Sequence, residues 1–571
     1  MRTPFARWRS GFTRPIAAAL LVATGTACRD TARPGPVEGI ADQITASYLC
    51  GNEFVLANRA PEPITVHYAV GGTAEVGELT LPGAPQQGET TTRLITLKQG
   101  PLEVSAGDDL ALQLENGGQP CSPPAAPQPQ ASVGEWSAPF PWPVVAVHLH
   151  LLPDGRVLSW GRQGAPQVYD PADGSFSAAP SVTMVFCAGH TFLADGRLLV
   201  SGGHLDDLRG LRDVNIFGSG THSWVSVQPM HFARWDPTNT ALPNGEILAL
   251  AGTDEAGEEV ATPEIWNGSS WRSLPGASRA LPYYPRTFVA PNGMVFYAGE
   301  LQQTAYLDPA GTGRWIPVGE SRYGRRDYGS AVMYQPGKVM ILGGSDPPDG
   351  APTATAELID LNTVTPRWQY TGSMHYSRRQ LNATILPDGQ VLVTGGTSSA
   401  GFSDRAGAVH AAELWNPDTG EWSKLAENQV SRVYHSTSLL LPDGRVLHAG
   451  SGDGPGLPRE LSAELFAPPY LFKGARPVMV DAPEQIRYSQ PFPIITPDAG
   501  QVLRVTLVRL ASVTHAFDQS QRFAELEFRR TAGGLTVQTP ESSVVAPPGP
   551  YLLAILNGAG VPSVGSVVHI E

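Results

Sequence analysis

The chain has 571 residues, enough for two to four domains. It contains 62 glycines and 53 prolines, and only 16% of its residues are charged, a composition typical of short strands joined by tight turns. The net charge of −14 argues against nucleic acid as a partner, because phosphate binding requires a basic surface. An acidic solvated surface explains the charge simply, so the charge assigns no function.

The N-terminus has the pattern of a targeting segment. Residues 1–15 are basic, and residues 16–27 form an apolar run that ends in small residues and is too short to span a membrane. Cys28 follows directly, as in a bacterial lipoprotein cleavage site, although Gly25 stands where Leu is usual. We predict a signal peptide over residues 1–28 and lipidation of Cys28, with simple secretion as the alternative. The protein would then be extracytoplasmic and would touch a membrane only through its lipid.

The next segment, residues 40–122, alternates apolar and polar residues and predicts a small β module. Cys50 opens this segment and Cys121 closes it, so we expect the two to form a disulfide in an oxidising compartment. Cys187 then remains as an unpaired thiol that requires an explanation. Residues 123–135 continue as a Pro-rich linker.

Residues 136–473 repeat one unit, an apolar strand, a turn of the Pro-Asp-Gly type and a second apolar strand. The spacing of roughly 40 to 55 residues is typical of propeller blades. Seven copies predict a seven-bladed kelch β-propeller, whose ring must close to remove exposed strand edges; a solenoid is the alternative. The turn glycines of the copies are Gly155, Gly196, Gly245, Gly293, Gly337, Gly389 and Gly444.

The repeat stops before residues 474–571, where shorter strands predict a C-terminal immunoglobulin-like β-sandwich. The expected fold is therefore all-β: N-terminal β module, propeller and sandwich.

Tyr434 and His435 stand side by side just before the first strand of the last blade, in "RVYHSTSLLLPDGRV". At the end of a strand both side chains can reach one site, and phenolate and imidazole suit copper, iron or zinc. Packing is the simpler explanation of such a pair when it stands alone.

The pair belongs to a set of four stretches that run in family order, with "FCAGHTFLADGRLLVSGG", "VTHAFDQSQRF" and "LNGAGVPSVGSVV". In these stretches, residues 136–571 resemble the galactose oxidase and glyoxal oxidase family of radical copper oxidases. The resemblance implies a copper ion on the propeller axis with an axial Tyr434 and the imidazoles of His435 and His515, the latter on a loop of the sandwich. It also places Cys187 at the cysteine that the family links to a tyrosine.

The chain departs from the family at that tyrosine. In "ARWDPTNTALPNGE" the tyrosine position is occupied by Asp236, and Asp254 stands where the family has an aromatic shield. A carboxylate cannot form the thioether or hold a tyrosyl radical, although Asp236 can still bind a metal. We therefore expect no Cys-Tyr radical cofactor, and we expect the family's oxidase activity to be lost or weakened. Tyr283 and Tyr284, in the next blade, are the alternative tyrosines for Cys187.

If the chain were active, the resemblance implies oxidation of a primary alcohol or aldehyde, small or part of a carbohydrate, with dioxygen reduced to hydrogen peroxide. Tyr434 would act as the general base. Arg325 or Arg326 falls near the position of the family's substrate-binding arginine, and the equally good alternative is that the two are solvated surface residues. His148, His150 and His190 are expected to line the channel or to pack. The rival function is a non-catalytic surface protein that binds glycans or proteins, and another metal-dependent reaction at Asp236 is a third possibility.

Overall fold

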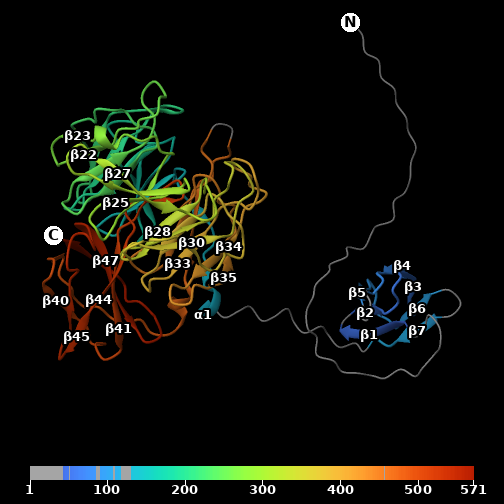
Figure 1. The fold of residues 1–571 in the computed structure, drawn as a ribbon. Helices are drawn as coiled ribbons and strands as arrows, with labels where there is room; N and C mark the ends of the chain where they lie inside the picture. Colours follow the sequence, from blue (N-terminus) through green and yellow to red (C-terminus); the bar gives the residue numbers. More distant parts are fainter. Residues whose placement is uncertain (1–42, 51, 85–89, 107–109, 117–129, 455–456) are drawn as a thin grey trace, which may run out of the picture. The chain divides into compact units, whose positions relative to one another are not determined.

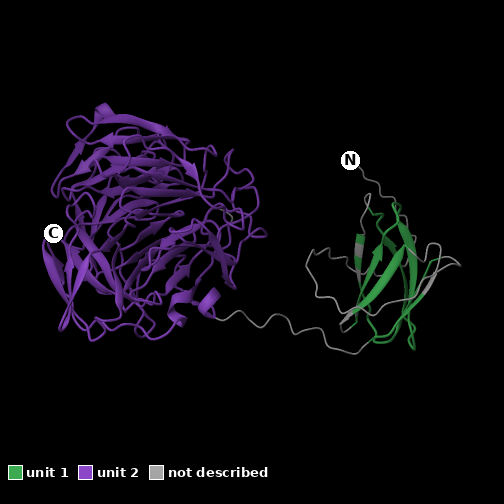
Figure 2. Ribbon diagram, turned by 60° about the horizontal axis from the view of Figure 1, so that its bottom comes forward, with its two compact units in different colours: residues 1–128 green, residues 129–571 purple. Residues whose placement is uncertain are grey.

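The structure is a computed structural model that describes residues 43–50, 52–84, 90–106, 110–116, 130–454 and 457–571. It divides into two compact units, residues 1–128 and residues 129–571 (Figure 2). Both units are built from antiparallel sheets, so the predicted all-β class is confirmed. The described residues contain no helix long and apolar enough to cross a membrane.

The N-terminal unit contains two sheets around one apolar core that includes Phe54, Val66 and Leu102. The first sheet is β1 (Ile44–Cys50), β2 (Glu53–Asn58) and β5 (Thr90–Ile95), and the second is β4 (Val76–Leu81), β3 (Ile64–Val70), β6 (Leu102–Ala106) and β7 (Leu110–Leu114). Cys28, Cys121 and the side chain of Cys50 lie outside the described residues, as does the segment 1–28. The predicted disulfide, lipidation site and domain boundaries therefore stay predictions.

The second unit contains the seven predicted blades, each built on four antiparallel strands, which follow chain order in blades 1 to 6 (Figure 1). Blade 1 consists of β10 (His148–Leu151), β11 (Val157–Trp160), β12 (Gln167–Asp170) and β13 (Ser175–Ala178), and blade 2 of β14 (Ala188–Phe192), β15 (Leu198–Gly202), β18 (Val214–Gly218) and β19 (Ser223–Val227). Blade 3 consists of β20 (Thr238–Ala241), β21 (Ile247–Leu250), β22 (Glu264–Trp266) and β23 (Trp271–Ser273). Blade 4 consists of β24 (Arg286–Val289), β25 (Val295–Gly299), β26 (Gln303–Asp308) and β27 (Arg314–Glu320). A small hairpin of β16 (His204–Asp206) and β17 (Arg209–Gly210) extends from blade 2.

Blades 5 and 6 follow the same order, whereas blade 7 is completed by strands from the start of the unit. Blade 5 consists of β28 (Ser330–Gln335), β29 (Lys338–Leu342), β30 (Ala356–Asp360) and β31 (Gln369–Tyr370), and blade 6 of β32 (Asn382–Ile385), β33 (Val391–Thr394), β34 (Ala411–Trp415) and β35 (Trp422–Glu427). Blade 7 consists of β36 (Thr437–Leu440), β37 (Val446–Ala449), β38 (Ser462–Ala467) and β8 (Glu135–Trp136), and β9 (Phe140–Pro141) also pairs with β38. A short helix α1 (Gln130–Val133) precedes β8.

The Pro-Asp-Gly turns fold each blade for a local reason. In blade 1 the Leu152 N–H donates to the Arg156 carbonyl at 2.8 Å, and Gly155 adopts a φ of 83° that a residue with a Cβ rarely tolerates. The Asp154 carboxylate accepts a hydrogen bond from the Arg156 N–H at 3.1 Å, which closes the turn. The two strands that leave the turn are fully buried, because each blade packs between two neighbours.

The ring closes in two ways. The inner strand β10 of blade 1 lies beside β36 of blade 7, and β8 completes the outer edge of blade 7 before the chain enters blade 1. Because strands from both ends of the ring segment pair within blade 7, the ring is closed and each blade packs between two neighbours.

Buried ion pairs repeat within the blades. Arg234 pairs with Glu264 in blade 3, and Arg326 pairs with Glu357 in blade 5 at 2.6 Å. Arg378–Glu413 and Arg432–Glu464 are the matching pairs of blades 6 and 7. Each arginine joins the loop before an inner strand to the third strand of the same blade, so these pairs position the loops on the propeller axis.

The C-terminal sandwich places a hairpin inside the propeller. Its sheets are β39 (Gln485–Ile486), β48 (Ser566–Ile570), β47 (Gly549–Asn557), β41 (Val502–Arg509) and β44 (Phe523–Leu526), facing β40 (Pro491–Ile495), β46 (Gly534–Gln538) and β45 (Phe528–Thr531). Arg504 donates to the Asp388 carbonyl at 2.7 Å, so the sandwich packs on the turn face of the ring. From there β42 (Ser512–Thr514) pairs with β10, and β43 (Phe517–Asp518) returns, with His515 at the tip between them.

Candidate metal centre

Six blades present one residue each toward the axis in an unusual backbone conformation. Cys187 directly precedes the inner strand of blade 2, and the equivalent residues of the next five blades stand two positions before theirs. All six have a positive φ: Cys187 57°, Asp236 58°, Tyr284 46°, Tyr328 50°, Gln380 59° and His435 65°. For residues other than glycine this conformation costs roughly 1–2 kcal/mol each, and such residues often gather at functional sites.

Backbone hydrogen bonds join neighbours in this axial ring. The Asp236 N–H donates to the Cys187 carbonyl at 2.9 Å, and the Tyr284 N–H donates to the Asp236 carbonyl at 3.0 Å. The Gln380 N–H likewise donates to the Tyr328 carbonyl at 2.8 Å. The relative positions of these side chains are therefore set by main-chain contacts between blades.

His515 enters the ring from the sandwich hairpin. Its Nε2 lies 2.9 Å from the Nε2 of His435, and both imidazoles are buried, at 3% and 4% exposure. The other nitrogen of each ring is hydrogen-bonded: His435 Nδ1 lies 2.5 Å from the Gly452 carbonyl oxygen, and His515 Nδ1 lies 2.7 Å from Thr514 Oγ1. A carbonyl only accepts, so His435 carries its proton on Nδ1 and turns the Nε2 lone pair toward His515.

Both imidazoles are neutral in this environment. Burial lowers the pKa of His435 to about 3, and burial lowers the pKa of His515 well below its usual range, with His435 and Arg286 adding to the effect. A neutral imidazole whose other nitrogen donates to a carbonyl is the usual form of a metal-ligating histidine.

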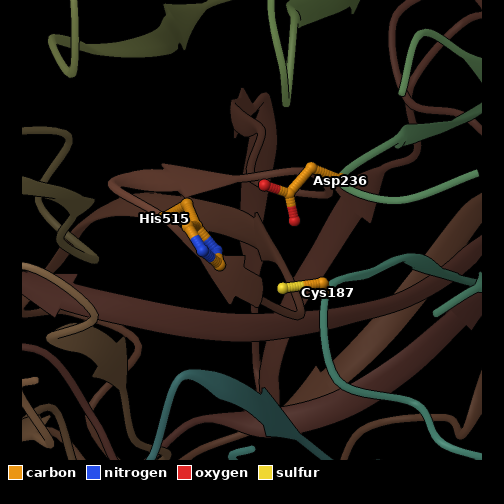
Figure 3. A group of neighbouring side chains, drawn as sticks. All are labelled: Cys187, Asp236 and His515. Carbon is orange, nitrogen blue, oxygen red and sulfur yellow. The ribbon is translucent and has the colours of Figure 1, made fainter. Parts of the chain in front are cut away.

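A thiol and a carboxyl complete this cluster. Cys187, Asp236 and His515 each offer a ligand atom, and these atoms all lie within 4.8 Å of one another. Figure 3 shows the three side chains, which come from blade 2, blade 3 and the sandwich hairpin, pointing toward one another. Asp236 Oδ1 is buried without a hydrogen-bond partner, and burial raises the pKa of Asp236 to about 8, partly offset by hydrogen bonds with Cys187 and Tyr284.

Tyr434 lies against His435. Their ring centroids are 3.7 Å apart, and the Tyr434 ring is 5.9 Å from that of His515. The Tyr434 hydroxyl hydrogen-bonds with that of Tyr328, and burial raises the pKa of Tyr434 well above its usual range. The structure therefore brings together Tyr434, His435, His515, Asp236 and Cys187.

Aromatic residues cover this cluster, among them Tyr284, which the sequence offered as an alternative tyrosine for Cys187, and others that the sequence did not single out. Tyr284 stacks on His515 with ring centroids 4.5 Å apart, and Phe186 meets His435 edge-on at 5.8 Å. Phe402 and Tyr328 pack on Tyr434 at 4.6 and 5.7 Å. Tyr284 and Tyr328 carry a signal that an alignment of the blades on their turns would reveal, since both stand two residues before an inner strand.

The two candidate substrate-binding arginines differ in environment. Arg326 is 3% exposed, and its guanidinium bonds Glu357 and the carbonyls of Gly343 and Thr355, which makes it part of the blade framework. Arg325 is 36% exposed and bonds Glu300 at 2.5 Å. Asp254 caps a surface turn through the Ala256 N–H at 2.8 Å.

A row of histidines supports the cluster from blades 1 and 2. The Cys187 N–H donates to His148 Nε2 at 3.1 Å, so the neutral His148 donates from Nδ1 to His190 Nε2 at 3.0 Å. His190 then donates from Nδ1 to Ser512 Oγ at 2.6 Å. His148 and His150 both stack on Trp160, at 5.0 and 4.5 Å. The row links the Cys187 loop to the strand that carries His515.

The donor set fits a metal ion. A thiol, a carboxylate oxygen without a partner and the His515 imidazole converge in a buried space, and His435 contacts His515 there. Such mixed ligands suit copper and zinc. Cys187 is the free cysteine among the described residues, and its ring neighbour in the next blade is a carboxylate.

Comparisons with known proteins agree with this architecture. A family model for "Glyoxal oxidase N-terminus" matches residues 351–470, and one for "Galactose oxidase-like, Early set domain" matches residues 476–570. A galactose oxidase of Gibberella zeae is 28% identical over 492 residues, which cover 77% of this chain and 71% of that protein. The aldehyde oxidase GLOX of Vitis pseudoreticulata is 28% identical over 443 residues, covering 68% and 82%. A solved fungal alcohol oxidase of the AA5 family, in complex with copper, superposes with a TM-score of 0.71 at 25% identity, covering 77% of this chain and all of that one.

Proposed function

Because this chain is a member of the galactose oxidase and glyoxal oxidase-like family, we propose that it binds copper on its propeller axis but lacks the cofactor for two-electron alcohol oxidation. The ligands in this proposal are His435, His515, Tyr434 and Asp236. The substrate class inherited from the family would be a primary alcohol or aldehyde, small or part of a carbohydrate.

The observation that carries the metal site is the contact between His435 and His515. The buried Nε2 atoms of His435 and His515 lie 2.9 Å apart, and the lone pair of the His435 Nε2 faces His515. One N–H···N hydrogen bond satisfies this pair in the metal-free protein, and a cation would take the place of that proton. The nearby Asp236 Oδ1 has no partner among the described residues. A cation between these atoms would satisfy all three groups at once.

The identity of residue 236 supports the second half of the proposal. By resemblance, Asp236 occupies the position of the tyrosine that the family joins to Cys187. Copper exchanges one electron at a time, so removing two electrons from an alcohol requires a second redox group. A carboxylate cannot be that group, and we therefore expect no peroxide-forming turnover of primary alcohols.

The remaining groups have roles that do not require turnover. The rings of Tyr284, Phe186 and Phe402 cover the imidazoles and Tyr434, which keeps water from the cluster. Arg325 retains partial exposure, which supports it over Arg326 as a contact for a polar ligand. The basic and apolar pattern of residues 1–28 supports an extracytoplasmic location, secreted or lipid-anchored.

Copper binding tests the site. We expect metal-stripped protein to take up one Cu²⁺ per chain, with nitrogen hyperfine structure in the electron paramagnetic resonance spectrum. His435→Ala should abolish this uptake, while His67→Ala should not, because His67 is an exposed histidine of the N-terminal unit. Equal copper uptake by wild type and His435→Ala would refute the site.

Activity tests the missing cofactor. Copper-loaded wild type should form no hydrogen peroxide from primary alcohols or aldehydes above a metal-free control. In Asp236→Tyr a phenol replaces the carboxyl beside Cys187, and copper with dioxygen should remove about two hydrogens from the Cys187 peptide as a thioether forms. Strong peroxide formation by the wild type would contradict the proposal.

A further inference from the structure

We propose that Cys187 is itself a ligand of the axial metal through its thiolate sulfur, together with Asp236, His435 and His515. This inference rests on the proposed metal site and changes its chemistry: the sulfur binds the metal directly instead of being tied to a tyrosine ring.

The distances among Cys187, Asp236 and His515 are those of a nearly assembled site of three ligands. Metal–sulfur bonds of about 2.3 Å and metal–nitrogen bonds of about 2.0–2.1 Å keep two ligand atoms within about 4.4 Å of each other. The ligand atoms of Cys187, Asp236 and His515 lie within 4.8 Å, so small side-chain rotations suffice to close the site. His435 lies outside this group of three, and its Nε2 is 2.9 Å from the Nε2 of His515, so it would join the site from the His515 side.

A second, independent observation points to a ligand at this place. Asp236 is 2% exposed, and its Oδ1 has no hydrogen-bond partner in the part of the chain that the structure describes. Leaving a buried polar atom unsatisfied costs roughly 1–3 kcal/mol. In Figure 3 the carboxyl, the thiol and the His515 ring are directed toward one common space. A cation in that space is the group that would satisfy the oxygen.

The charges favour the thiolate as the fourth ligand. A divalent cation buried among neutral groups carries a large desolvation penalty. The Cys187 thiolate and the Asp236 carboxylate supply two negative charges, and the imidazoles of His435 and His515 are neutral. With Tyr434 as a neutral phenol, the resulting site has no net charge, whereas the imidazoles and one carboxylate without the thiolate would leave one positive charge buried.

The backbone holds the sulfur in place from both sides. Cys187 has a φ of 57°, its N–H donates to His148 Nε2 at 3.1 Å, and its carbonyl accepts from the Asp236 N–H at 2.9 Å. A buried cysteine that serves only as apolar packing has no need of a strained backbone held in this way. A thiolate ligand also directs the site toward soft or borderline ions such as Cu⁺ and Zn²⁺, away from Mg²⁺ and Mn²⁺.

Cobalt substitution tests the sulfur ligand without redox chemistry. Reduced, metal-stripped full-length protein is titrated with Co²⁺ and followed by absorption. We expect an intense thiolate-to-cobalt charge-transfer band that reaches its full height at one Co²⁺ per chain. X-ray absorption of the Zn²⁺ form should show one sulfur at about 2.3 Å, with nitrogen and oxygen at about 2.0–2.2 Å.

Cysteine variants give the controls. Cys187→Ser should abolish the band and weaken Co²⁺ binding by more than the 10- to 100-fold typical of a residue that only supports a ligand. Cys50→Ser should leave both unchanged, and Tyr434→Phe should keep the band. A band that persists in Cys187→Ser, or Co²⁺ binding without a band in wild type, overturns the thiolate ligand and leaves the copper site standing. If neither Cu²⁺ nor Co²⁺ binds, both proposals fail.

Discussion

Replacing Asp236 by asparagine should make the stability of the metal-free protein less dependent on pH. Burial raises the pKa of Asp236 from 3.8 to about 8. In the unfolded chain the carboxyl loses its proton near pH 4, whereas in the folded protein it keeps the proton until about pH 8. Between these values the folded state binds more protons, so the free energy of unfolding falls as pH rises. The side-chain amide of the Asp236→Asn variant does not titrate, so the variant lacks this fall.

The size of the effect follows from the pKa difference. At roughly 1.36 kcal/mol per pKa unit, the wild type loses up to about 4 kcal/mol of stability at this residue between pH 4 and pH 7. The loss reaches about 6 kcal/mol by pH 9 and then levels off, because Asp236 is ionised in both states. The amide of the variant adds a cost of roughly 1–3 kcal/mol for a buried donor without a partner. That cost is the same at every pH. The change with pH in the stability difference between wild type and variant therefore reports only the ionisation of the Asp236 carboxyl.

The assay is denaturant unfolding of metal-free protein at pH 4, 7 and 9. Every tryptophan except Trp8 lies between residues 136 and 422, so tryptophan fluorescence reports on the propeller. Asp206→Asn, at an exposed position of β16, is the control and should behave as wild type at all three pH values. A stability difference between wild type and Asp236→Asn that is the same at pH 4 and pH 9 would refute the reasoning, because it would mean that Asp236 ionises normally in the fold.

Three further outcomes test the framework around the site. Arg378→Met should lower stability by about 3–5 kcal/mol, because it leaves the buried Glu413 without its partner, while Arg197→Met, at the exposed pair with Asp195, should cost about 0–1 kcal/mol in the same unfolding assay. His148→Phe should weaken copper binding by about 10- to 100-fold in a competition titration, through loss of its bond to the Cys187 N–H. Deleting residues 1–128 should leave the melting temperature of the propeller unchanged, whereas deleting residues 1–141 should lower it, because β8 and β9 are lost from β38.

The blades were predictable because their signal is local. Each Pro-Asp-Gly turn fixes a hairpin within a few residues, as the Leu152–Arg156 bond shows, and the apolar runs on both sides can only be buried between neighbouring blades. The closing strand was not predictable in the same way. β8 contains two residues, Glu135 and Trp136, and its pairing with β38 joins parts of the chain that are more than three hundred residues apart.

The site was predictable only in part, for a physical reason. Tyr434, His435 and His515 stand in distinctive stretches, but the geometry around them depends on which residue of each blade adopts the left-handed backbone. Tyr284, which the sequence offered as an alternative partner of Cys187, and Tyr328, which it did not single out, both stand at that position. Arg326 and Arg325 are adjacent in sequence, yet the ion pair with Glu357 buries one and leaves the other partly exposed.

The axial ring explains why a protein would keep this costly arrangement. Without a cation, the fold holds six non-glycine residues of the axial ring at positive φ and an unsatisfied Asp236 oxygen. Each of these features lowers stability and none is required by a propeller blade, since blade 1 forms without a left-handed residue before its inner strand. A metal that binds only the folded state offsets such costs by about 2.7 kcal/mol at a hundred times its dissociation constant. The pH-dependent instability expected from Asp236 should therefore disappear when the metal is added, because the same carboxylate that is unfavourable in the empty site becomes a ligand in the filled one.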